Sequence, residues 1–414
     1  METDQTVCIL GLGYIGLPTA TVIAASGHQV IGVDVQPGIV AAINAATAHF
    51  SEPDLDLALH QAVQDGRLRA QTAAAPAQVF MVCVPTPTDE HHQCDLSMVE
   101  AAIHAIAPVL TSGNLIIVES TCPPRTLVDR VVPILRHYDL EPGVDVHVAY
   151  CPERVLPGNI LSELVDNDRV AGGLTPACAQ HAARFLKTYV KGEIIECDSV
   201  TAETVKLVEN SYRDLNIAFA NQLSMCADTL GVRASEVIEL ANRHPRVNVM
   251  APGPGVGGHC ISVDPWFLIQ AAPNQFSLLE TAREVNLAKE QFIIERVLQI
   301  ARDRHCTEVV VLGLSYKPDS EDLRESPALA IARHLSHVPD IQLSAIDPFV
   351  EPERVDDLKI EPIELLHELC DHQRLVVRLV PHTCFDDIEP GSVASAWFDS
   401  LDRWRPMDAV TQVA

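Results

Sequence analysis

Near its start the chain reads Val7-Cys8-Ile9-Leu10-Gly11-Leu12-Gly13-Tyr14-Ile15-Gly16, and this stretch decides the fold. The apolar run before Gly11 predicts a buried strand, and the alanine-rich segment after Gly16 predicts a helix that ends near residues 26–27. A second strand is expected over residues 29–33, and Asp34 ends it. Strand, glycine-rich turn, helix and strand in this order are typical of a doubly wound dinucleotide-binding domain.

Each glycine of this turn has a different structural role. Gly11 makes the tight turn, Gly13 admits the pyrophosphate to the backbone, and Gly16 allows close packing of helix and strand. The helix N-terminus, with Tyr14-Ile15, offers backbone amides and a positive dipole end to phosphate. Asp34 is expected to accept hydrogen bonds from the adenosine ribose, and its charge would repel a 2′-phosphate. The pattern therefore predicts NAD as the cofactor.

Further strands of a parallel sheet are expected over residues 78–84, 115–119 and 145–149. Ligands of such sheets bind beyond the carboxyl ends of the strands, where Thr86, Thr121 and Glu153 fall. The threonines could equally be ordinary turn or N-cap residues. Glu153 could act as a base with a raised pKa, or it could form a structural salt bridge with Arg154.

Helical periodicity begins at Thr201 and continues for about thirty residues. Lys206 and Asn210 are one turn apart and share a helix face. Together they could donate hydrogen bonds to an alkoxide or oxyanion. The alternative is a solvated lysine on a surface helix, which the apolar neighbours of Lys206 disfavour.

A thiol follows two adjacent glycines in the stretch Pro252-Gly253-Pro254-Gly255-Val256-Gly257-Gly258-His259-Cys260-Ile261-Ser262-Val263-Asp264-Pro265. Glycines let a backbone pass close to a ligand, so Cys260 would be accessible to a substrate. The alternative is a turn that holds an inert buried cysteine.

Beyond a second long helix over 277–304, strands are expected over 308–314, 341–346 and 375–380. They predict a smaller α/β domain without a GxGxxG turn, so a second dinucleotide is not expected there. Lys317 and Arg324 could hold a phosphorylated ligand in this domain. We therefore expect an α/β protein with a Rossmann-type NAD-binding domain over 1–198, a central helical dimerisation and catalytic region over 199–303, and a smaller Rossmann-like domain over 304–414.

Composition excludes several other classes. The formal charge of −27 over 414 residues argues against a nucleic-acid partner. No apolar run reaches the ~18 residues of a membrane span, and the acidic N-terminus is unlike a signal peptide. The 12 cysteines lack metal-ligand or paired spacing, which suits free thiols in a reducing cytoplasm and gives no metal site.

The motifs stand in the order GLGYIG, STCPPRT, YCPERVLPG, VKLVENSYRDLNIAFANQ, PGPGVGGHCISVDPWF and GLSYKPDSEDLRESP. This order resembles, over essentially the whole chain, the UDP-glucose and GDP-mannose 6-dehydrogenase family. ERVLPG and PGPGVGGHCI are similar to the branch that oxidises UDP-N-acetylhexosamines for polysaccharide biosynthesis, with UDP-N-acetyl-D-mannosamine the expected substrate. UDP-N-acetyl-D-glucosamine and UDP-glucose are the alternatives. Pro157 and Val263 depart from the UDP-glucose branch, which has Glu and Lys there.

The resemblance implies an NAD-dependent, four-electron oxidation of a primary alcohol to a carboxylate. The free thiols indicate the cytoplasm, and the long central helices, of a kind that often pairs with a copy of itself, predict a homodimer. The resemblance implies that Cys260 is the nucleophile, that Lys206 and Asn210 steady the oxyanion, and that Asp264 works with Lys206 and water. It also implies that Thr121 and Glu153 position that water, and that Thr86 and Arg324 contact the cofactor. The residues implied to contact the substrate are Arg154, Gly257, Lys317 and either Arg243 or Arg246. One of these last two arginines would do so across the dimer.

Two rival functions remain open from the sequence. A two-electron β-hydroxyacid dehydrogenase also pairs a fingerprint domain with a helical Lys-x-x-x-Asn, but it has no use for Cys260 or for the second α/β domain. A catalytically silent sensor would bind NAD and a nucleotide sugar and produce no NADH. The count of NADH per substrate distinguishes all of them.

Overall fold

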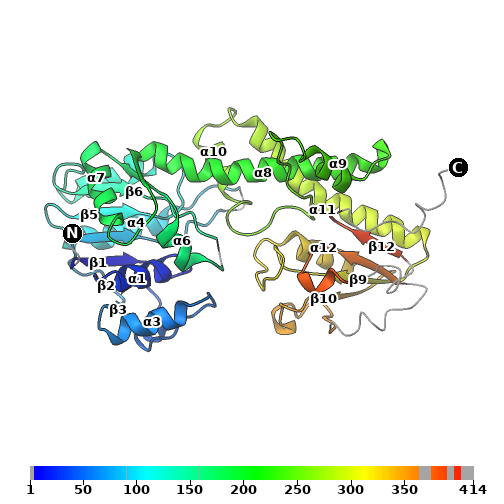
Figure 1. Ribbon diagram of the computed structural model, residues 1–414, viewed down its shortest axis with the longest axis horizontal. Helices are drawn as coiled ribbons and strands as arrows, with labels where there is room; N and C mark the ends of the chain where they lie inside the picture. Colours follow the sequence, from blue (N-terminus) through cyan, green and yellow to red (C-terminus); the bar gives the residue numbers. More distant parts are fainter. Residues whose placement is uncertain (1–3, 90, 157, 363–373, 389–395, 402–414) are drawn as a thin grey trace. The chain divides into compact units, whose positions relative to one another are not determined.

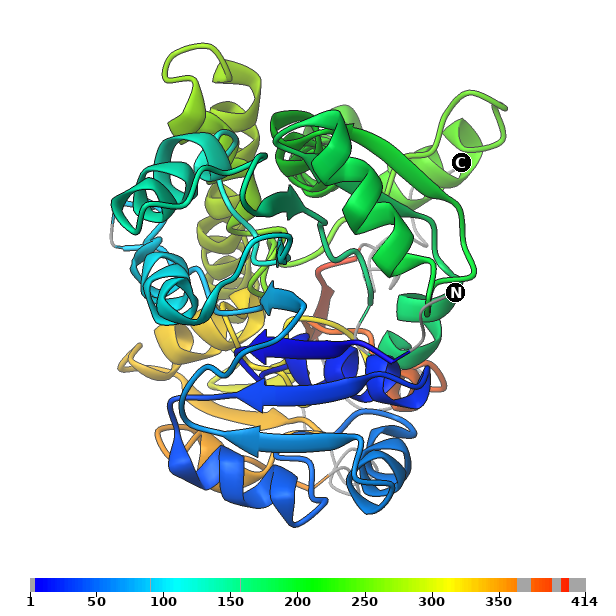
Figure 2. The same cartoon turned by 90° about the vertical axis from the view of Figure 1, so that its left-hand side faces the viewer.

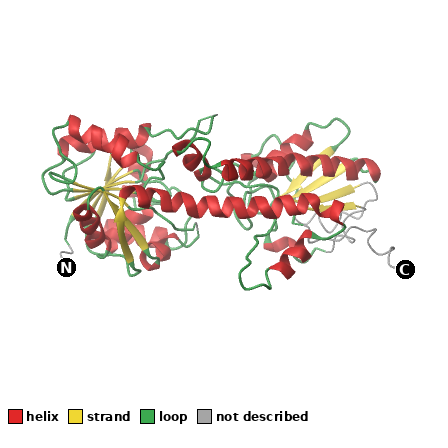
Figure 3. Ribbon diagram, turned by 90° about the horizontal axis from the view of Figure 1, so that it is seen from above, coloured by secondary structure: helices red, strands yellow, loops and turns green. Residues whose placement is uncertain are grey.

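The computed structural model describes residues 4–89, 91–156, 158–362, 374–388 and 396–401. The chain divides into two compact units, the first made by Met1–Glu209 with Trp266–Pro273 and the second by Asn210–Pro265 with Asn274–Ala414. The division falls inside two helices, α8 (Ser199–Leu230) and α10 (Asp264–Ala271), which are labelled in Figure 1. Figure 3 shows the strands of each unit in yellow among red helices.

The first unit contains an eight-stranded sheet in the order β3-β2-β1-β4-β5-β6-β7-β8. Its strands are β1 (Thr6–Leu10), β2 (Gln29–Val33), β3 (Leu68–Gln71), β4 (Val79–Val82), β5 (Leu115–Val118), β6 (His147–Tyr150), β7 (Arg169–Gly173) and β8 (Ile194–Asp198). All neighbouring pairs are parallel except β6 and β7. Figure 2 shows β1, β2 and β3 side by side as blue arrows. The predicted doubly wound domain is confirmed.

Helices cover both faces of this sheet, because successive strand residues point to opposite sides. Val7 and Ile9 of β1 pack with α1, α2, α3 and α7, while Cys8 and Leu10 pack with α4, α5 and the start of α8. The helices are α1 (Gly16–Ala25), α2 (Pro37–Asn44), α3 (Leu55–Gln64), α4 (Ser97–Ile106), α5 (Val132–His137), α6 (Ile160–Asp166) and α7 (Pro176–Leu186), with a 3-10 turn at Ala107–Val109 and a π turn at Leu127–Val131.

Three strands of the first unit were not predicted from the sequence. β3 and β8 have no apolar run, and β7 ends in two glycines that pack tightly against backbone. A Cβ on Gly172 would lie 2.3 Å from that of Ala202, so the glycine lets α8 approach the sheet.

The second unit has a four-stranded parallel sheet in the order β10-β9-β11-β12. Its strands are β9 (Glu308–Leu312), β10 (Gln342–Ile346), β11 (Arg374–Arg378) and β12 (Ala396–Asp399), and its helices include α9 (Ala234–Ala241), α11 (Ser277–Asp303) and α12 (Pro327–Ser336), with 3-10 turns at Pro352–Arg354 and Thr383–Phe385. Apolar residues of α11 and α12 form one core with β9 and β11. The smaller Rossmann-like domain is therefore confirmed as a fold. In the described part of the chain, no helix has the length and apolar character to cross a membrane.

Candidate active site

The turn between β1 and α1 has the geometry that a dinucleotide needs. Gly11 has φ +87°, and a Cβ there would lie 2.6 Å from Cys83 O. A Cβ on Gly16 would lie 1.8 Å from Gly11 O, whereas one on Gly13 would meet no atom within 4 Å. Gly11 and Gly16 therefore close the turn, and the open space beside Gly13 fits a pyrophosphate. α1 follows without a side-chain cap, which leaves its N-terminal dipole available to an anion.

Asp34 lies at the end of β2 and joins this turn. Its Oδ2 accepts a hydrogen bond from Leu12 N at 3.1 Å, and its Oδ1 accepts one from Gln36 N at 2.9 Å. A carboxylate has about four acceptor positions, so this half-buried side chain keeps capacity for ribose hydroxyls. Nearby, the exposed ring of Tyr14 stacks on Phe50 with centroids 4.3 Å apart. These residues fit NAD.

Glu153 and Lys206 lie together in the first unit. Burial raises the pKa of Glu153, while the positive charges of Lys206 and Arg169 oppose the rise. Only 4% of Glu153 is exposed, and its Oε1 accepts a hydrogen bond from Val155 N. Burial raises the pKa of Cys122, which follows β5, and the charge of Lys206 opposes that rise. The ammonium group therefore lies near the carboxyl ends of β5 and β6.

Arg154 points to a different partner from the one that the sequence left open. Its Nη1 donates to Glu209 Oε1 at 2.7 Å, and its Nη2 donates to the backbone oxygen of Asp168. Thus Arg154 bonds to α8 and to the residue before β7, and Glu153 is not needed to neutralise it. Pro157, which follows in the same loop, lies outside the described residues.

The loop after β5 is attached to α8 by Glu203, a residue that sequence reasoning did not select. Its carboxylate accepts hydrogen bonds from Arg125 N at 2.6 Å and from Leu127 N at 2.8 Å. Burial raises the pKa of Glu203 to about 7, although these amides lower it. Glu203 thereby fixes the loop that carries the half-buried Thr121. A signal was present, because Glu203 stands one helical turn before Lys206 in an apolar segment.

In the second unit, Cys260 is half-buried at the end of the glycine-rich stretch. Gly258 has φ +81°, and a Cβ there would lie 2.9 Å from the ring of Tyr316. Gly258 N donates to Arg324 O at 3.1 Å, which holds the stretch beside the β9–α12 loop. Burial, Asp322 and Cys260 raise the pKa of Tyr316, so the phenol and the thiol are close.

Asn210 and Asp264 meet in the second unit. Asn210 Nδ2 donates to Asp264 Oδ2 at 2.6 Å, and Asp264 is 3% exposed. Asp264 N donates to Cys260 O at 2.8 Å, so the turn that contains the thiol starts α10. A carboxylate in the first turn of a helix is favoured by the dipole. The structure thus joins three of the predicted site residues through two hydrogen bonds.

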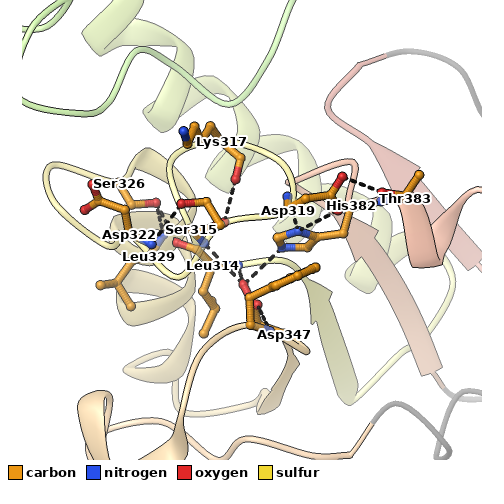
Figure 4. Close-up of polar contacts among 12 residues, drawn as sticks. Leu314, Ser315, Lys317, Asp319, Asp322, Ser326, Leu329, Asp347, His382 and Thr383 are labelled. Atoms are coloured by element: carbon orange, nitrogen blue, oxygen red, sulfur yellow. Dashed lines mark hydrogen bonds and ion pairs between the residues drawn. The ribbon is translucent and has the colours of Figure 1, made fainter. Parts of the chain in front are cut away.

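The loop after β9, whose polar contacts Figure 4 shows, makes the same backbone hydrogen bonds as the turn after β1. Gly313 has φ +84° and donates to Ile346 O, as Gly11 donates to Val33 O. Leu314 N donates to Asp347 Oδ2 at 2.7 Å, as Leu12 N donates to Asp34. The acceptors of Asp347 are further used by His382 Nε2, at 3.2 Å, and by backbone amides of Ser315 and Phe349.

This second turn differs at the positions where a dinucleotide approaches. Ser315 stands two residues after Gly313, where the first turn has Gly13, and its Oγ donates to Lys317 O at 2.8 Å. Lys317 is half-buried on the same loop, with its ammonium 6.0 Å from the Tyr316 ring centroid. The loop thus presents a cation beside Tyr316.

The remaining predicted arginines occupy two places. Arg324 is exposed, and its Nε donates to Asp322 Oδ1 at 2.9 Å. Arg243 and Arg246 lie exposed after α9, with Arg243 Nη2 3.8 Å from Glu239 Oε1.

Thr86 is half-buried in the loop after β4, and a Cβ on Gly257 would lie 2.5 Å from Glu325 O. In the described ranges, no group of three His, Cys, Asp or Glu side chains is arranged to hold a metal.

Three family models match the chain in sequence. They are described as the NAD binding domain of the UDP-glucose/GDP-mannose dehydrogenase family over residues 5–190, its central domain over 200–288 and its UDP binding domain over 310–400. The chain belongs to the UDP-glucose/GDP-mannose dehydrogenase family. This family member is thus an NAD-dependent UDP-sugar dehydrogenase.

The dehydrogenase is similar to curated proteins over nearly its full length. It is 46% identical to an NDP-N-acetyl-D-galactosaminuronic acid dehydrogenase from Ralstonia solanacearum, with 98% of this chain and 97% of the relative covered. It is 43% identical to a UDP-N-acetyl-D-mannosamine dehydrogenase from Campylobacter jejuni, with 95% and 100% covered. A solved UDP-N-acetyl-mannosamine dehydrogenase from S. aureus has a TM-score of 0.86 at 37% identity, covering 96% of this chain and 99% of its own.

Proposed function

We propose that this dehydrogenase oxidises the primary alcohol of a UDP-N-acetylhexosamine, UDP-N-acetyl-D-mannosamine foremost, to the uronic acid through Cys260. The observation that carries the proposal is the thiol at the end of a glycine-rich stretch, next to Tyr316 and joined through Asp264 to Asn210. The similarity to UDP-N-acetyl-D-mannosamine dehydrogenases over nearly the whole chain supports the substrate class.

The chemistry needs a group that holds the sugar between two oxidations. NAD, when bound, supplies the hydride acceptor for both. The Cys260 thiolate adds to the carbonyl carbon of the aldehyde, and the thiohemiacetal so formed keeps the half-oxidised sugar attached. Loss of the second hydride leaves a thioester. Water attacks its carbonyl carbon, the C–S bond breaks, and the uronate and the thiolate are released.

Polar residues of both units have roles in this proposal. Lys206 and Asn210 donate hydrogen bonds to the oxyanions that form at the reacting carbon, and each such donor is typically worth ~3 kcal/mol. Asp264 acts with Lys206 on the attacking water. Glu153 and Thr121 position that water, and the raised pKa of the buried Glu153 makes it a stronger base than an exposed carboxylate.

Ligand contacts are proposed for residues on the loops of each unit. In the first unit, the turn from Gly11 to Gly16, with Tyr14-Ile15, and Asp34, Thr86 and Thr121 hold NAD, while Arg154 contacts substrate. In the second unit, Gly257, Lys317 and either Arg243 or Arg246 hold the UDP-sugar, and Arg324 contacts a cofactor phosphate. We also propose that the NAD-binding domain ends at residue 198, that the central helical region covers 199–303, and that the UDP-sugar-binding domain begins at residue 304.

A homodimer through the central helices is also proposed. Val208, Tyr212 and Phe219 of α8 are 50%, 60% and 58% exposed. Their spacing gives one apolar stripe along the helix. Water-exposed stripes of this kind favour pairing with another apolar surface. We further propose that the enzyme works in the cytoplasm, where the free thiols stay reduced, in the synthesis of a polysaccharide.

The N-acetylgalactosamine epimer is the second candidate, because the curated relatives with 46% identity are NDP-N-acetyl-D-galactosaminuronic acid dehydrogenases. UDP-N-acetyl-D-glucosamine and UDP-glucose are weaker alternatives. Purified enzyme with NAD should be assayed against UDP-glucose, UDP-N-acetyl-glucosamine, -mannosamine and -galactosamine, and GDP-mannose. The proposal expects an N-acetylhexosamine, with the mannosamine first, and a strong preference for UDP-glucose or GDP-mannose would refute it.

A further inference from the structure

The backbone that leads into the glycine-rich stretch is held by asparagine side chains. Asn216 of α8 donates from Nδ2 to Asn248 O at 2.9 Å and accepts at Oδ1 from Met250 N at 2.8 Å. Asn242, just after α9, accepts from Val249 N at 2.7 Å and donates to Val249 O at 2.9 Å. Each side-chain amide thus takes the place that a neighbouring strand would take.

A third asparagine connects this backbone to the interior of the second unit. Asn221 of α8 accepts at Oδ1 from Gly253 N at 2.9 Å and donates from Nδ2 to Asn286 Oδ1 at 2.9 Å. Asn221 and Asn286 are 0% and 1% exposed. Side-chain bonds with so little water around them are rigid, because breaking one leaves a buried polar group unpaired.

The connection continues to a buried ion pair. Asn286 Nδ2 donates to Asp214 Oδ1 at 2.8 Å, and Arg283 Nη1 donates to the same oxygen at 2.7 Å. A buried Arg–Asp pair adds little net stability compared with apolar side chains of similar volume. The pair instead fixes one arrangement of α8 and α11, and with it the position of Asn286.

The glycine-rich stretch itself has little freedom to take up a displacement. A Cβ on Gly255 would lie 3.0 Å from Pro327 Cγ and 3.3 Å from Asn286 O. Farther along, Gly257 and Gly258 are packed against the Glu325 backbone and the Tyr316 ring. A shift of Gly253 would therefore be passed along the backbone toward Cys260.

We propose that Asn221 and Asn286 are positioning residues for Cys260 in nucleotide-sugar oxidation. The inference rests on the proposed role of Cys260 as the nucleophile. Neither asparagine needs to touch the substrate. Their side chains fix the position of Gly253 relative to α8 and α11. The tightly packed glycines that follow then fix the position of the Cys260 sulfur.

Hydrogen exchange on the native enzyme tests the tether without any substitution. The amides of Val249, Met250 and Gly253 should exchange slowly, because they bond to asparagine side chains on a helix or directly after one. A peptide over residues 248–255 that takes up deuterium at the rate of an unstructured chain would overturn the proposal.

Variants then test the effect on the thiol. Asn221→Ala and Asn286→Ala should lower kcat by about 10- to 100-fold, the scale expected for a reacting group displaced by up to an ångström. KM for NAD should stay within about twofold, because the change acts after binding. The rate at which iodoacetamide alkylates Cys260, followed on its peptide by mass spectrometry, should change in the same variants.

Ser224→Ala is the matched control. It removes a 2.6 Å bond from Lys289 Nζ to Ser224 Oγ, which links the same two helices, and a 2.8 Å bond from Ser224 Oγ to the backbone oxygen of Asn221, but it leaves the side-chain amide of Asn221 and its bond to Gly253 N in place. This control should keep kcat and the alkylation rate even if its melting temperature falls. If the asparagine variants behave as Ser224→Ala does, the positioning role is wrong. If Cys260→Ser keeps full uronate formation, the proposed function itself fails, which is a separate result.

Discussion

Asn210 Nδ2 donates a hydrogen bond to Asp264 Oδ2 at 2.6 Å, and the backbone amide of Asp264 bonds to Cys260 O. Asn210 therefore has two roles available to it. It can donate to an oxyanion, and it can hold the aspartate that starts α10 directly after the thiol-bearing turn. Both roles depend on its amide nitrogen.

Replacing Asn210 by alanine should slow uronate formation by about 100-fold or more, the usual effect of losing an oxyanion donor. Gln222→Ala, on an exposed part of the same helix, serves as the control. Steady-state kinetics on both variants check the prediction. A kcat for Asn210→Ala within about threefold of the parent would contradict it.

Glu153 should make kcat fall on the acid side of the pH profile, at a pH above the usual pKa of a glutamate. Burial raises its pKa, and a base works only when ionised, so activity is lost as the pH falls through that raised pKa. In Glu153→Gln this fall should disappear and the remaining rate should be low. The profile of kcat against pH measures this, with exposed Glu193→Gln as the control. An unchanged fall in Glu153→Gln would assign it to another group.

Glu203 should make the stability of the enzyme depend on pH. Its pKa rises from 4.5 to about 7 on folding, so the folded protein binds the proton more tightly and stability falls as the pH rises through that window. The folding free energy lost across this window is about 3 kcal/mol, because each pKa unit corresponds to about 1.36 kcal/mol. The melting temperature of Glu203→Gln, relative to that of the parent, should therefore rise by several degrees between about pH 5 and pH 8. A gap that does not change with pH, or one matched by exposed Glu196→Gln, would contradict this.

Asp34 should determine the choice between NAD and NADP. Asp34→Asn keeps an oxygen for Leu12 N but removes the charge that repels a 2′-phosphate, so the ratio of kcat/KM for NADP to that for NAD should rise about tenfold or more. Asp347→Asn is a matched control, because Asp347 makes the same bond to Leu314 N in the other unit. The prediction fails if both variants change the ratio equally.

The local patterns of the sequence were sufficient to predict the two α/β folds and most of their strands. Apolar runs identified β1, β2, β4, β5, β6, β9, β10 and β11, because buried parallel strands are largely apolar. β7 and β8 lacked that signal, since β7 ends in packing glycines and β8 is mostly exposed.

Contacts between distant residues could not be predicted in the same way. Glu203 reaches the loop of Thr121, and Asn221 reaches Gly253, only because α8 runs beside both. The similarity of the Asp34 and Asp347 turns was hidden as well. Ser315 stands where the fingerprint has its second glycine, so the sequence does not show the glycine pattern. The hydrogen bond of Gly313 N to Ile346 O nevertheless keeps the same turn geometry.

The central claim is that one thiol carries the sugar through two oxidations. The most direct test is to count NADH formed per molecule of UDP-N-acetyl-D-mannosamine consumed, for the parent enzyme and for Cys260→Ser, and to identify the product by mass spectrometry. We predict two NADH and the uronate for the parent, and no more than one NADH without uronate for the variant. Two NADH with full uronate formation by Cys260→Ser would contradict the account.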